Sequence, residues 1–195
     1  PDSCGMQCAK DIEELIQTTT TGRVAGMLAE PILGVGGFIT PPKDYYKVAS
    51  DIIRKYGGVF IADEVQTGFG RTGKMWGIEN YGVEPDMMTM AKGIANGLPL
   101  GAVIATPAIA DSLSKPSIST YGGNPISTAA ANAVLDEIEG KNLADNCAKQ
   151  GRRLRAGLKA IQRKHPDLIG EVRGMGLMQA LELVADETAG DRTPN

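Results

Sequence analysis

The sequence has few cysteines, and this scarcity argues against two kinds of structural support. Its 195 residues include three cysteines, at Cys4, Cys8 and Cys147. The number is odd, and no pair has the C-x-x-C spacing that is typical of zinc and redox motifs. We therefore expect neither a disulfide framework nor a metal site, and a reducing compartment is the default.

A basic excess and long apolar runs are missing as well. Lysine and arginine number 20 against 23 acidic residues, for a formal net charge of −3. Nucleic-acid binding normally requires a basic surface, so nucleic acid is not an expected partner. No apolar stretch reaches the roughly 18 residues that a membrane-spanning helix needs, so we expect no membrane span.

The two ends of the sequence lack the features of a complete chain. It begins with Pro1-Asp2-Ser3-Cys4, without a methionine or a targeting pattern. It ends on the polar run 191–195, where we expect no terminal element. We interpret the sequence as a fragment of a longer chain. With 42% hydrophobic residues it can form one core, or one domain and part of another.

What the sequence does contain is an alternation of helical and strand patterns. Apolar residues three or four apart indicate helices, and short apolar runs bounded by glycine indicate buried strands. Helices are expected over 8–18, 44–56, 107–113, 126–138 and 143–164, and strands over 24–29, 59–62, 87–91 and 100–105, with two more within 168–184. Strand, helix and strand over 24–62 form a βαβ unit, which implies a parallel sheet. The predicted fold class is α/β.

The pattern changes near residues 138–165. Helices and strands alternate before this region, whereas strand, glycine-rich turn and strand follow it. We therefore predict that residues 1–138 belong to a large domain. Residues 139–195 are predicted to be a linker helix and the start of a small α+β domain.

Two side chains of different chemistry follow neighbouring strands. Asp63 comes directly after the apolar run 59–62, and Lys92 comes after the run 87–91. Because ligands of open α/β sheets bind at the carboxyl ends of strands, we expect both residues at one ligand-binding edge. Apolar neighbours favour a neutral lysine amine, which attacks carbonyl carbons such as the aldehyde of pyridoxal phosphate. A carboxylate can then pair with the pyridine nitrogen of that cofactor.

Each residue taken alone has a plainer interpretation. A single lysine is usually a surface residue with its ammonium in water, and an aspartate after a strand commonly stabilises a turn. Trp76 is compatible with lining a site and with anchoring a loop, and His165 with ending a helix. The pairing of Asp63 and Lys92 makes a cofactor site a serious hypothesis without excluding the plainer one.

The longest motif resembles a known enzyme family. The stretches 60–71 (FIADEVQTGFGR), 85–86 and 90–97 (MAKGIANG) closely resemble the signature of class III aminotransferases, which are fold-type I pyridoxal phosphate enzymes. Further matching motifs are Glu30-Pro31-Ile32, 120–125 and 173–178, so the resemblance covers nearly the whole chain. Within the family, the likeness is greatest to the alanine–glyoxylate type. It implies a partial fold-type I large domain with a mainly parallel sheet, followed by the start of the C-terminal domain.

The resemblance implies roles for the matching residues around the cofactor. Lys92 is expected to bond covalently to the cofactor aldehyde and to move the proton of the substrate's α-carbon. Asp63 is expected to pair with the pyridinium nitrogen, and Gln66 to hydrogen-bond the ring hydroxyl. Val65 is expected to pack on the face of the ring.

Two further residues receive roles at the margins of the site. Thr120 is expected to bind the phosphate of the partner subunit's cofactor, which implies a homodimer, or a dimer of dimers, with shared active sites. Glu30 is expected to lie near the substrate end without touching the cofactor. The residues that bind the substrate carboxylate and the near phosphate loop are expected outside this sequence.

The resemblance implies transamination between an amino acid and a 2-oxo acid. The favoured pair is alanine and glyoxylate, giving pyruvate and glycine. Some relatives that act on ω-amino groups carry glutamine and an acidic residue where this sequence has Leu33 and Val35, which favours α-amino donors. Alternatives are transfer from β-alanine or 4-aminobutyrate to pyruvate, an aminomutase, and an inactive truncated chain. The alanine–glyoxylate type implies a mitochondrial location, with cytoplasm or peroxisome as alternatives.

Overall fold

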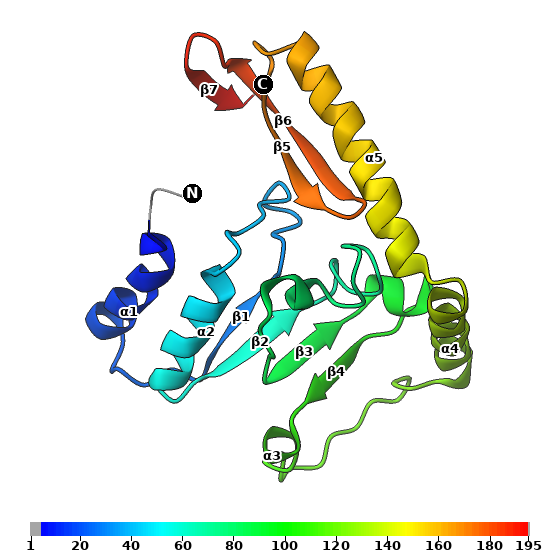
Figure 1. Ribbon diagram of the computed structural model, residues 1–195. Helices are drawn as coiled ribbons and strands as arrows, with labels where there is room; N and C mark the ends of the chain where they lie inside the picture. The colour runs from blue at the N-terminus through cyan, green and yellow to red at the C-terminus, as the bar shows by residue number, and fades with distance from the viewer. Residues whose placement is uncertain (1–4, 195) are drawn as a thin grey trace.

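The structure, a computed structural model that describes residues 5–194, contains two β-sheets with helices on their faces (Figure 1). The strands of the first sheet, in spatial order, are β1 (Gly26–Ala29), β2 (Val59–Asp63), β3 (Met87–Met90) and β4 (Ala102–Ala105). The second sheet contains β5 (Ile169–Met175), β6 (Met178–Asp186) and β7 (Asp191–Pro194). The helices are α1 (Gln7–Thr19), α2 (Tyr45–Lys55), α3 (Pro107–Ala110), α4 (Pro125–Gly140) and α5 (Leu143–Lys164), with 3₁₀ helices η1 (Gly77–Tyr81) and η2 (Lys92–Ala95).

The first sheet is parallel over three of its four strands. β1 pairs with β2 and β2 with β3 in parallel, as the βαβ pattern predicts, whereas β4 runs antiparallel to β3. A parallel neighbour needs a crossover of about a dozen residues or more. The connection from β3 to β4 contains only η2 and a turn, in which Asn96 and Gly97 have φ of 45° and 117°. It therefore reverses the chain. The predicted α/β fold class, with a mainly parallel sheet, is confirmed.

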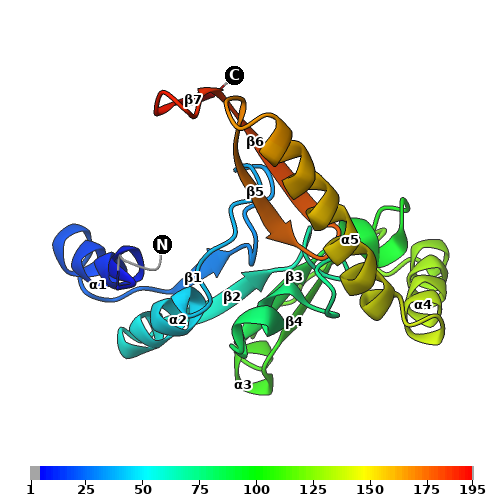
Figure 2. The ribbon, with the colours of Figure 1, turned by 45° about the horizontal axis from the view of Figure 1, so that its top comes forward.

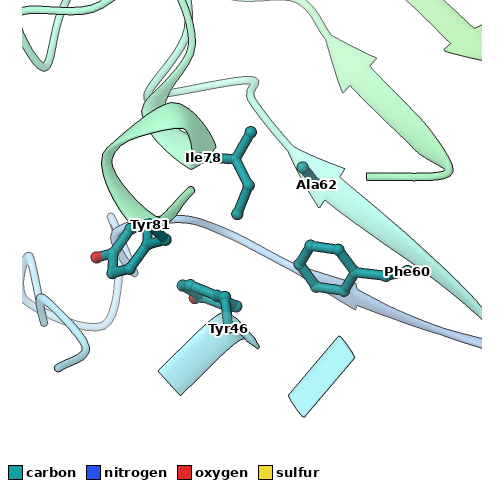
Figure 3. Packing of buried hydrophobic residues seen from close by; sticks show 5 residues of the cluster. All are labelled: Tyr46, Phe60, Ala62, Ile78 and Tyr81. Atoms are coloured by element: carbon teal, nitrogen blue, oxygen red, sulfur yellow. The ribbon is translucent and has the colours of Figure 1, made fainter. Parts of the chain in front are cut away.

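The core beneath this sheet is built from aromatic side chains (Figure 3). Tyr46 of α2 lies edge-on to Tyr81 of η1, with ring centroids 4.8 Å apart, and next to Phe60 of β2, at 5.8 Å. Ile78 and Ala62 complete the cluster. Each tyrosine hydroxyl donates to a backbone carbonyl, Tyr81 to Pro31 at 2.8 Å and Tyr46 to Glu30. The cluster therefore fixes α2 and η1 on the face of the sheet and holds the chain that leaves β1.

The second sheet lies against the long helix α5 (Figure 2). Arg155 of α5 donates to the carbonyl oxygens of Gly174, at 2.9 Å, and Val172, at 3.3 Å. Close backbone approach brings the two together, since a Cβ on Gly151 of α5 would lie 2.1 Å from the carbonyl oxygen of Gly176. The domain boundary between residues 138 and 139 stays a prediction. The strands of the first sheet precede it in sequence, and those of the second sheet follow it.

Two expectations about local structure are wrong. The polar segment at the C-terminal end forms a strand, β7, because its backbone pairs with β6 at Val184 and Asp186. The helix that begins at Pro107 ends at Ala110 and does not extend to Leu113. Over residues 5–194, no helix is both long and apolar enough to cross a membrane.

Candidate functional site

The carboxyl ends of β2 and β3 lie side by side. Asp63 of β2 pairs in register with Thr89 of β3, and the Glu64 amide donates to the Thr89 carbonyl at 2.9 Å. Lys92 follows at the start of η2. The structure therefore places Asp63 and Lys92 at the same edge of the sheet.

Adjacent carboxylates at this edge have different surroundings. Glu64 is fully buried, and its oxygens accept from the Thr67 hydroxyl at 2.6 Å and from the Gly77 and Ile78 amides at 2.8 Å. Burial raises the pKa of Glu64 above its ordinary value, while these three donors act in the opposite direction. The carboxylate joins β2 to the start of η1, so Glu64 has a structural role.

Asp63 keeps one oxygen available. Its Oδ1 accepts from the Val65 amide at 3.0 Å, which fixes the orientation of the carboxylate. Within residues 5–194, Oδ2 has no hydrogen-bond donor. Asp63 is only partly exposed and lines a cavity of about 540 Å³, together with Glu30, Leu33 and Tyr45. Its carboxylate is held and open to a donor from this cavity.

Lys92 lines a second cavity, of about 220 Å³. Its other lining residues come from three separate parts of the chain and are Phe38, Gln66, Arg71, Leu177 and Met178. Lys92 is exposed, although Met90 and Ile94 beside it in sequence are buried. The apolar surroundings that the sequence suggested for the amine are therefore not formed by the residues that the structure describes, because these side chains pack into the core.

The backbone at this cavity is strained. Lys92 has φ of 42° and Phe38 has φ of 55°, in the left-handed region that side chains other than glycine seldom adopt. Such conformations cost about 1–3 kcal/mol each and gather at functional sites. Within residues 5–194, the Lys92 amine has no carboxylate or carbonyl partner, and the Gln66 amide has no hydrogen bond. Strained, unpaired polar groups around one cavity are typical of a ligand site.

The remaining predicted residues, Val65, Glu30 and Thr120, do not line the cavity of Lys92. Val65 lies in the turn after β2 and is half-buried. Glu30 ends the β1 segment, where its Oε2 accepts from the Gly34 amide at 3.0 Å, and it lines the cavity of Asp63. Thr120 is exposed in the segment before α4, next to Tyr121, and does not line either cavity. Within this chain, the structure does not bring Thr120 to Lys92.

Several residues of the site were not predicted from the sequence. Arg71 and Phe38 line the cavity of Lys92, and Glu64 holds η1. The GFGR motif contained a signal for Arg71, since a charged residue in a glycine-rich segment after a buried strand is a site candidate. Phe38 lies far from the motif in sequence and carried no such signal. Trp76, for which two roles were open, packs edge-on against Phe69 at 5.2 Å and anchors the loop.

The residues fit pyridoxal phosphate in chemistry. The cofactor needs an amine for its aldehyde, a carboxylate for its ring nitrogen and a donor for its ring hydroxyl. Lys92, the free oxygen of Asp63 and the unpaired amide of Gln66 provide these groups at one edge of the sheet. The partly parallel sheet and this set of side chains match the fold-type I class of pyridoxal phosphate proteins.

The chain belongs to the class III aminotransferases, whose family model matches residues 2–193. It is 51% identical over 185 residues to "Alanine--glyoxylate aminotransferase 2 homolog 2, mitochondrial" of Arabidopsis thaliana, covering 94% of this chain and 39% of the relative. It is 41% identical to a taurine–pyruvate aminotransferase of Bilophila wadsworthia, covering 93% of this chain and 42% of the relative. The solved structure of a Bacillus anthracis aminotransferase matches with a TM-score of 0.88 and 37% identity, over 94% of this chain and 42% of that one. The resemblance to this family is confirmed, and the chain spans about two fifths of the length of its relatives.

Proposed function

We propose that the protein is a pyridoxal phosphate-dependent aminotransferase that transfers the amino group of alanine to glyoxylate. The observation that carries the proposal is the unpaired Lys92 amine in one cavity with Gln66, at the sheet edge of Asp63. When bound, pyridoxal phosphate supplies the aldehyde that accepts the amino group and a ring that withdraws electrons from the substrate's α-carbon. Family membership supports the cofactor and the reaction type.

The side chains of this chain have separate tasks in the proposed reaction. Lys92 would hold the cofactor aldehyde through Nζ and, once the substrate's amine has displaced it, would move the proton from the substrate's α-carbon to C4′ of the cofactor. The Val65 amide fixes Oδ1 of Asp63, so the carboxylate would still have an oxygen to accept a hydrogen bond from a protonated pyridine nitrogen. A carboxylate in this position keeps that nitrogen protonated. Gln66 supplies a side-chain amide for the ring hydroxyl, and Val65 an apolar surface for the ring.

Two assignments concern the edge of the site and the assembly. Thr120 is proposed to bind the cofactor phosphate of a second subunit in a homodimer, or a dimer of dimers, with shared sites. Its exposure is compatible with this role. Glu30 is proposed to shape the substrate end, since it lines the cavity of Asp63 and is tied to Gly34. A mitochondrial location is proposed from the name of the Arabidopsis relative.

The substrate pair rests on two observations. The first comes from the family resemblance, since Leu33 and Val35 occupy the positions at which some relatives that act on ω-amino groups carry a glutamine and an acidic residue. The second is that a relative at 51% identity is named for alanine and glyoxylate. The second candidate is an ω-amino donor with pyruvate as acceptor, because the Bilophila relative is named for taurine and pyruvate. An aminomutase and an inactive chain are the remaining alternatives.

Donor and acceptor competition with the purified, cofactor-loaded protein tests the proposal. We expect pyruvate to form from alanine beyond one equivalent per cofactor only when glyoxylate is present. With glyoxylate as the acceptor, kcat/KM for alanine should exceed kcat/KM for β-alanine, 4-aminobutyrate and taurine. A higher kcat/KM with an ω-amino donor and pyruvate would establish the second candidate. Conversion of an amino acid to an isomer over many turnovers, without any 2-oxo acid, would indicate an aminomutase.

A further inference from the structure

One wall of the Lys92 cavity comes from the second sheet. Leu177 and Met178 lie at the turn between β5 and β6, and they line the cavity together with Phe38. The turn is attached to the loop after β2, because the Leu177 amide donates to the Arg71 carbonyl at 3.2 Å. Figure 2 shows the chain that leaves β1 beside β5. Two elements far apart in sequence therefore meet at the cavity.

Arg173 makes the contact between β5 and the chain that leaves β1. Its Nε donates to the Gly37 carbonyl at 2.8 Å, across 136 positions in sequence. Its Nη1 lies 2.9 Å from Glu171 and 3.3 Å from Glu182. The side chain is 11% exposed, so the two carboxylates offset the cost of removing a guanidinium from water.

The contact at Gly37 acts on a tight turn. Leu33 and Ile39 pair as an antiparallel bridge, with the Leu33 amide donating to the Ile39 carbonyl at 3.0 Å. Inside it, the Gly37 amide donates to the Gly34 carbonyl at 3.2 Å. A shift of Gly37 would therefore move Phe38, which is bonded to it, and Gly34, which is hydrogen-bonded to it.

Gly34 carries the effect on to Gln66. A Cβ at Gly34 would lie 2.2 Å from Nε2 of Gln66, so the turn rests directly against that amide. Phe38, which follows Gly37 in the sequence, lines the cavity and has a strained backbone conformation, with φ of 55°. An unconstrained turn would relax this conformation.

We propose that Arg173 is a positioning residue, which holds the turn 33–39 in place and thereby sets Phe38 and Gln66 at the Lys92 cavity. Arg173 acts through its hydrogen bond to the Gly37 carbonyl. It makes no hydrogen bond to Gln66 or Lys92, the cavity residues with roles in the proposed reaction. The meaning of the cavity as a cofactor site rests on the proposed function, whereas the positioning of the turn does not.

Arg192 offers a matched control. It pairs with the same Glu182, at 2.9 Å, and with Glu187, at 3.0 Å, but it is 55% exposed and makes no hydrogen bond to the turn. Arg173→Gln and Arg192→Gln each remove one cation from Glu182. Only the first removes the donor to Gly37.

Hydrogen exchange of the cofactor-free protein is the first readout. In Arg173→Gln we expect the amides of residues 33–38 to exchange about tenfold faster than in the wild type, as for the loss of one hydrogen bond to a charged group. In the same variant, the amides of α5 should exchange at the wild-type rate. In Arg192→Gln, the amides of residues 33–38 should also exchange at the wild-type rate. Equal exchange of residues 33–38 in the two variants and the wild type would overturn the proposal.

Arg173→Lys covers the case in which Arg173→Gln does not fold. It keeps a cation beside Glu171 and Glu182 but lacks the guanidinium that reaches these carboxylates and the Gly37 carbonyl together. We therefore expect exchange over 33–38 to be faster than in the wild type and slower than in a folded Arg173→Gln, with exchange in α5 unchanged. Wild-type exchange over 33–38 in Arg173→Lys would contradict the proposal.

Saturation with pyridoxal phosphate is the second readout, followed by the absorbance of the bound cofactor. We expect Arg173→Gln to raise the half-saturating concentration of pyridoxal phosphate several-fold, which corresponds to about 1 kcal/mol. Arg173→Lys should raise it less, and Arg192→Gln should leave it at the wild-type value. Unchanged half-saturation in Arg173→Gln would refute a role of the turn at the cofactor. If the wild type also failed to bind, the proposed function would fail, while the exchange comparison would still decide the positioning role.

Discussion

Asp63 and Glu64 are neighbours of the same chemical type with opposite surroundings. Glu64 is buried and accepts three hydrogen bonds, from Thr67, Gly77 and Ile78. Asp63 accepts one, and its second oxygen has no donor in the described part of the chain. A carboxylate with all its donors inside the protein stabilises the fold, and one held by a single amide can serve a ligand. Under the proposed function, the difference teaches that the number of hydrogen bonds that a carboxylate already accepts, more than its residue type or position, distinguishes Glu64 from Asp63 at this edge.

The largest expected effect is on activity, through Asp63. Asp63→Asn keeps the size of the side chain and removes the charge that would pair with a pyridinium nitrogen. We expect kcat/KM to fall about hundredfold, since a hydrogen bond to a charged group is worth about 1.5–3 kcal/mol. The midpoint of thermal unfolding of the cofactor-free protein should stay within a few degrees. Steady-state kinetics and calorimetry on one preparation test both halves, and a large loss of stability with intact activity would reverse the comparison.

The neighbouring substitution should have the opposite profile. In Glu64→Gln, one accepting oxygen becomes an amide donor that faces the donors of Thr67, Gly77 or Ile78. We expect a loss of about 2 kcal/mol in the free energy of unfolding, because buried donors are left without acceptors. Urea unfolding of the cofactor-free protein measures the loss. Glu79→Gln is a control from the same loop, and a loss of equal size there would show that Glu64 is not special.

The aromatic core predicts a pH dependence. Burial raises the pKa of Tyr46 and of Tyr81 above the ordinary 10.0. The folded protein then keeps protons that the unfolded chain releases, so the stability that they contribute is present below pH 10 and is lost as the pH rises above it. Tyr81→Phe should cost about 1 kcal/mol at pH 8 for the lost hydrogen bond to Pro31. Above pH 10 the free energy of unfolding should fall less steeply with pH in the variant than in the wild type. The two slopes should differ by about 1.4 kcal/mol per pH unit, the contribution of one titrating group. Parallel slopes for wild type and variant would contradict this account.

The smallest effect is expected at an exposed ion pair. Lys141 and Glu137, one turn apart at the end of α4, lie 2.5 Å apart and are 65% and 58% exposed. Lys141→Ala should change the free energy of unfolding by less than about 0.5 kcal/mol, because water and salt screen such pairs. A loss above 1 kcal/mol in urea unfolding at 0.15 M salt would show that contacts at the surface matter more here than saturation in the core.

Local pattern sufficed for much of the fold. The apolar periodicity within about 143–164 predicted α5, and the βαβ pattern predicted the parallel pairing of β1 and β2. The direction of β4 followed from the length of the connection at Asn96, which sequence reasoning did not weigh. β7 was missed because a polar strand gains its order from its partner β6 and not from its own residues.

The site divides in the same way. Asp63, Gln66 and Lys92 lie in one motif, so the sequence alone could propose them. Phe38 and Arg173 could not be found this way, because their contribution depends on a contact between residues 136 positions apart. Contacts of that kind exist only once the second sheet has met the chain that leaves β1.

The most direct test of the central claim is chemical labelling of the purified protein with pyridoxal phosphate, followed by borohydride reduction and peptide mass mapping. We expect a saturable absorbance band and one pyridoxyl adduct, on Lys92. Lys92→Ala should abolish both, and Lys74→Ala should change neither, since Lys74 donates to the Glu79 carbonyl in the nearby loop. Labelling spread over several lysines, without a saturable band, would contradict the account.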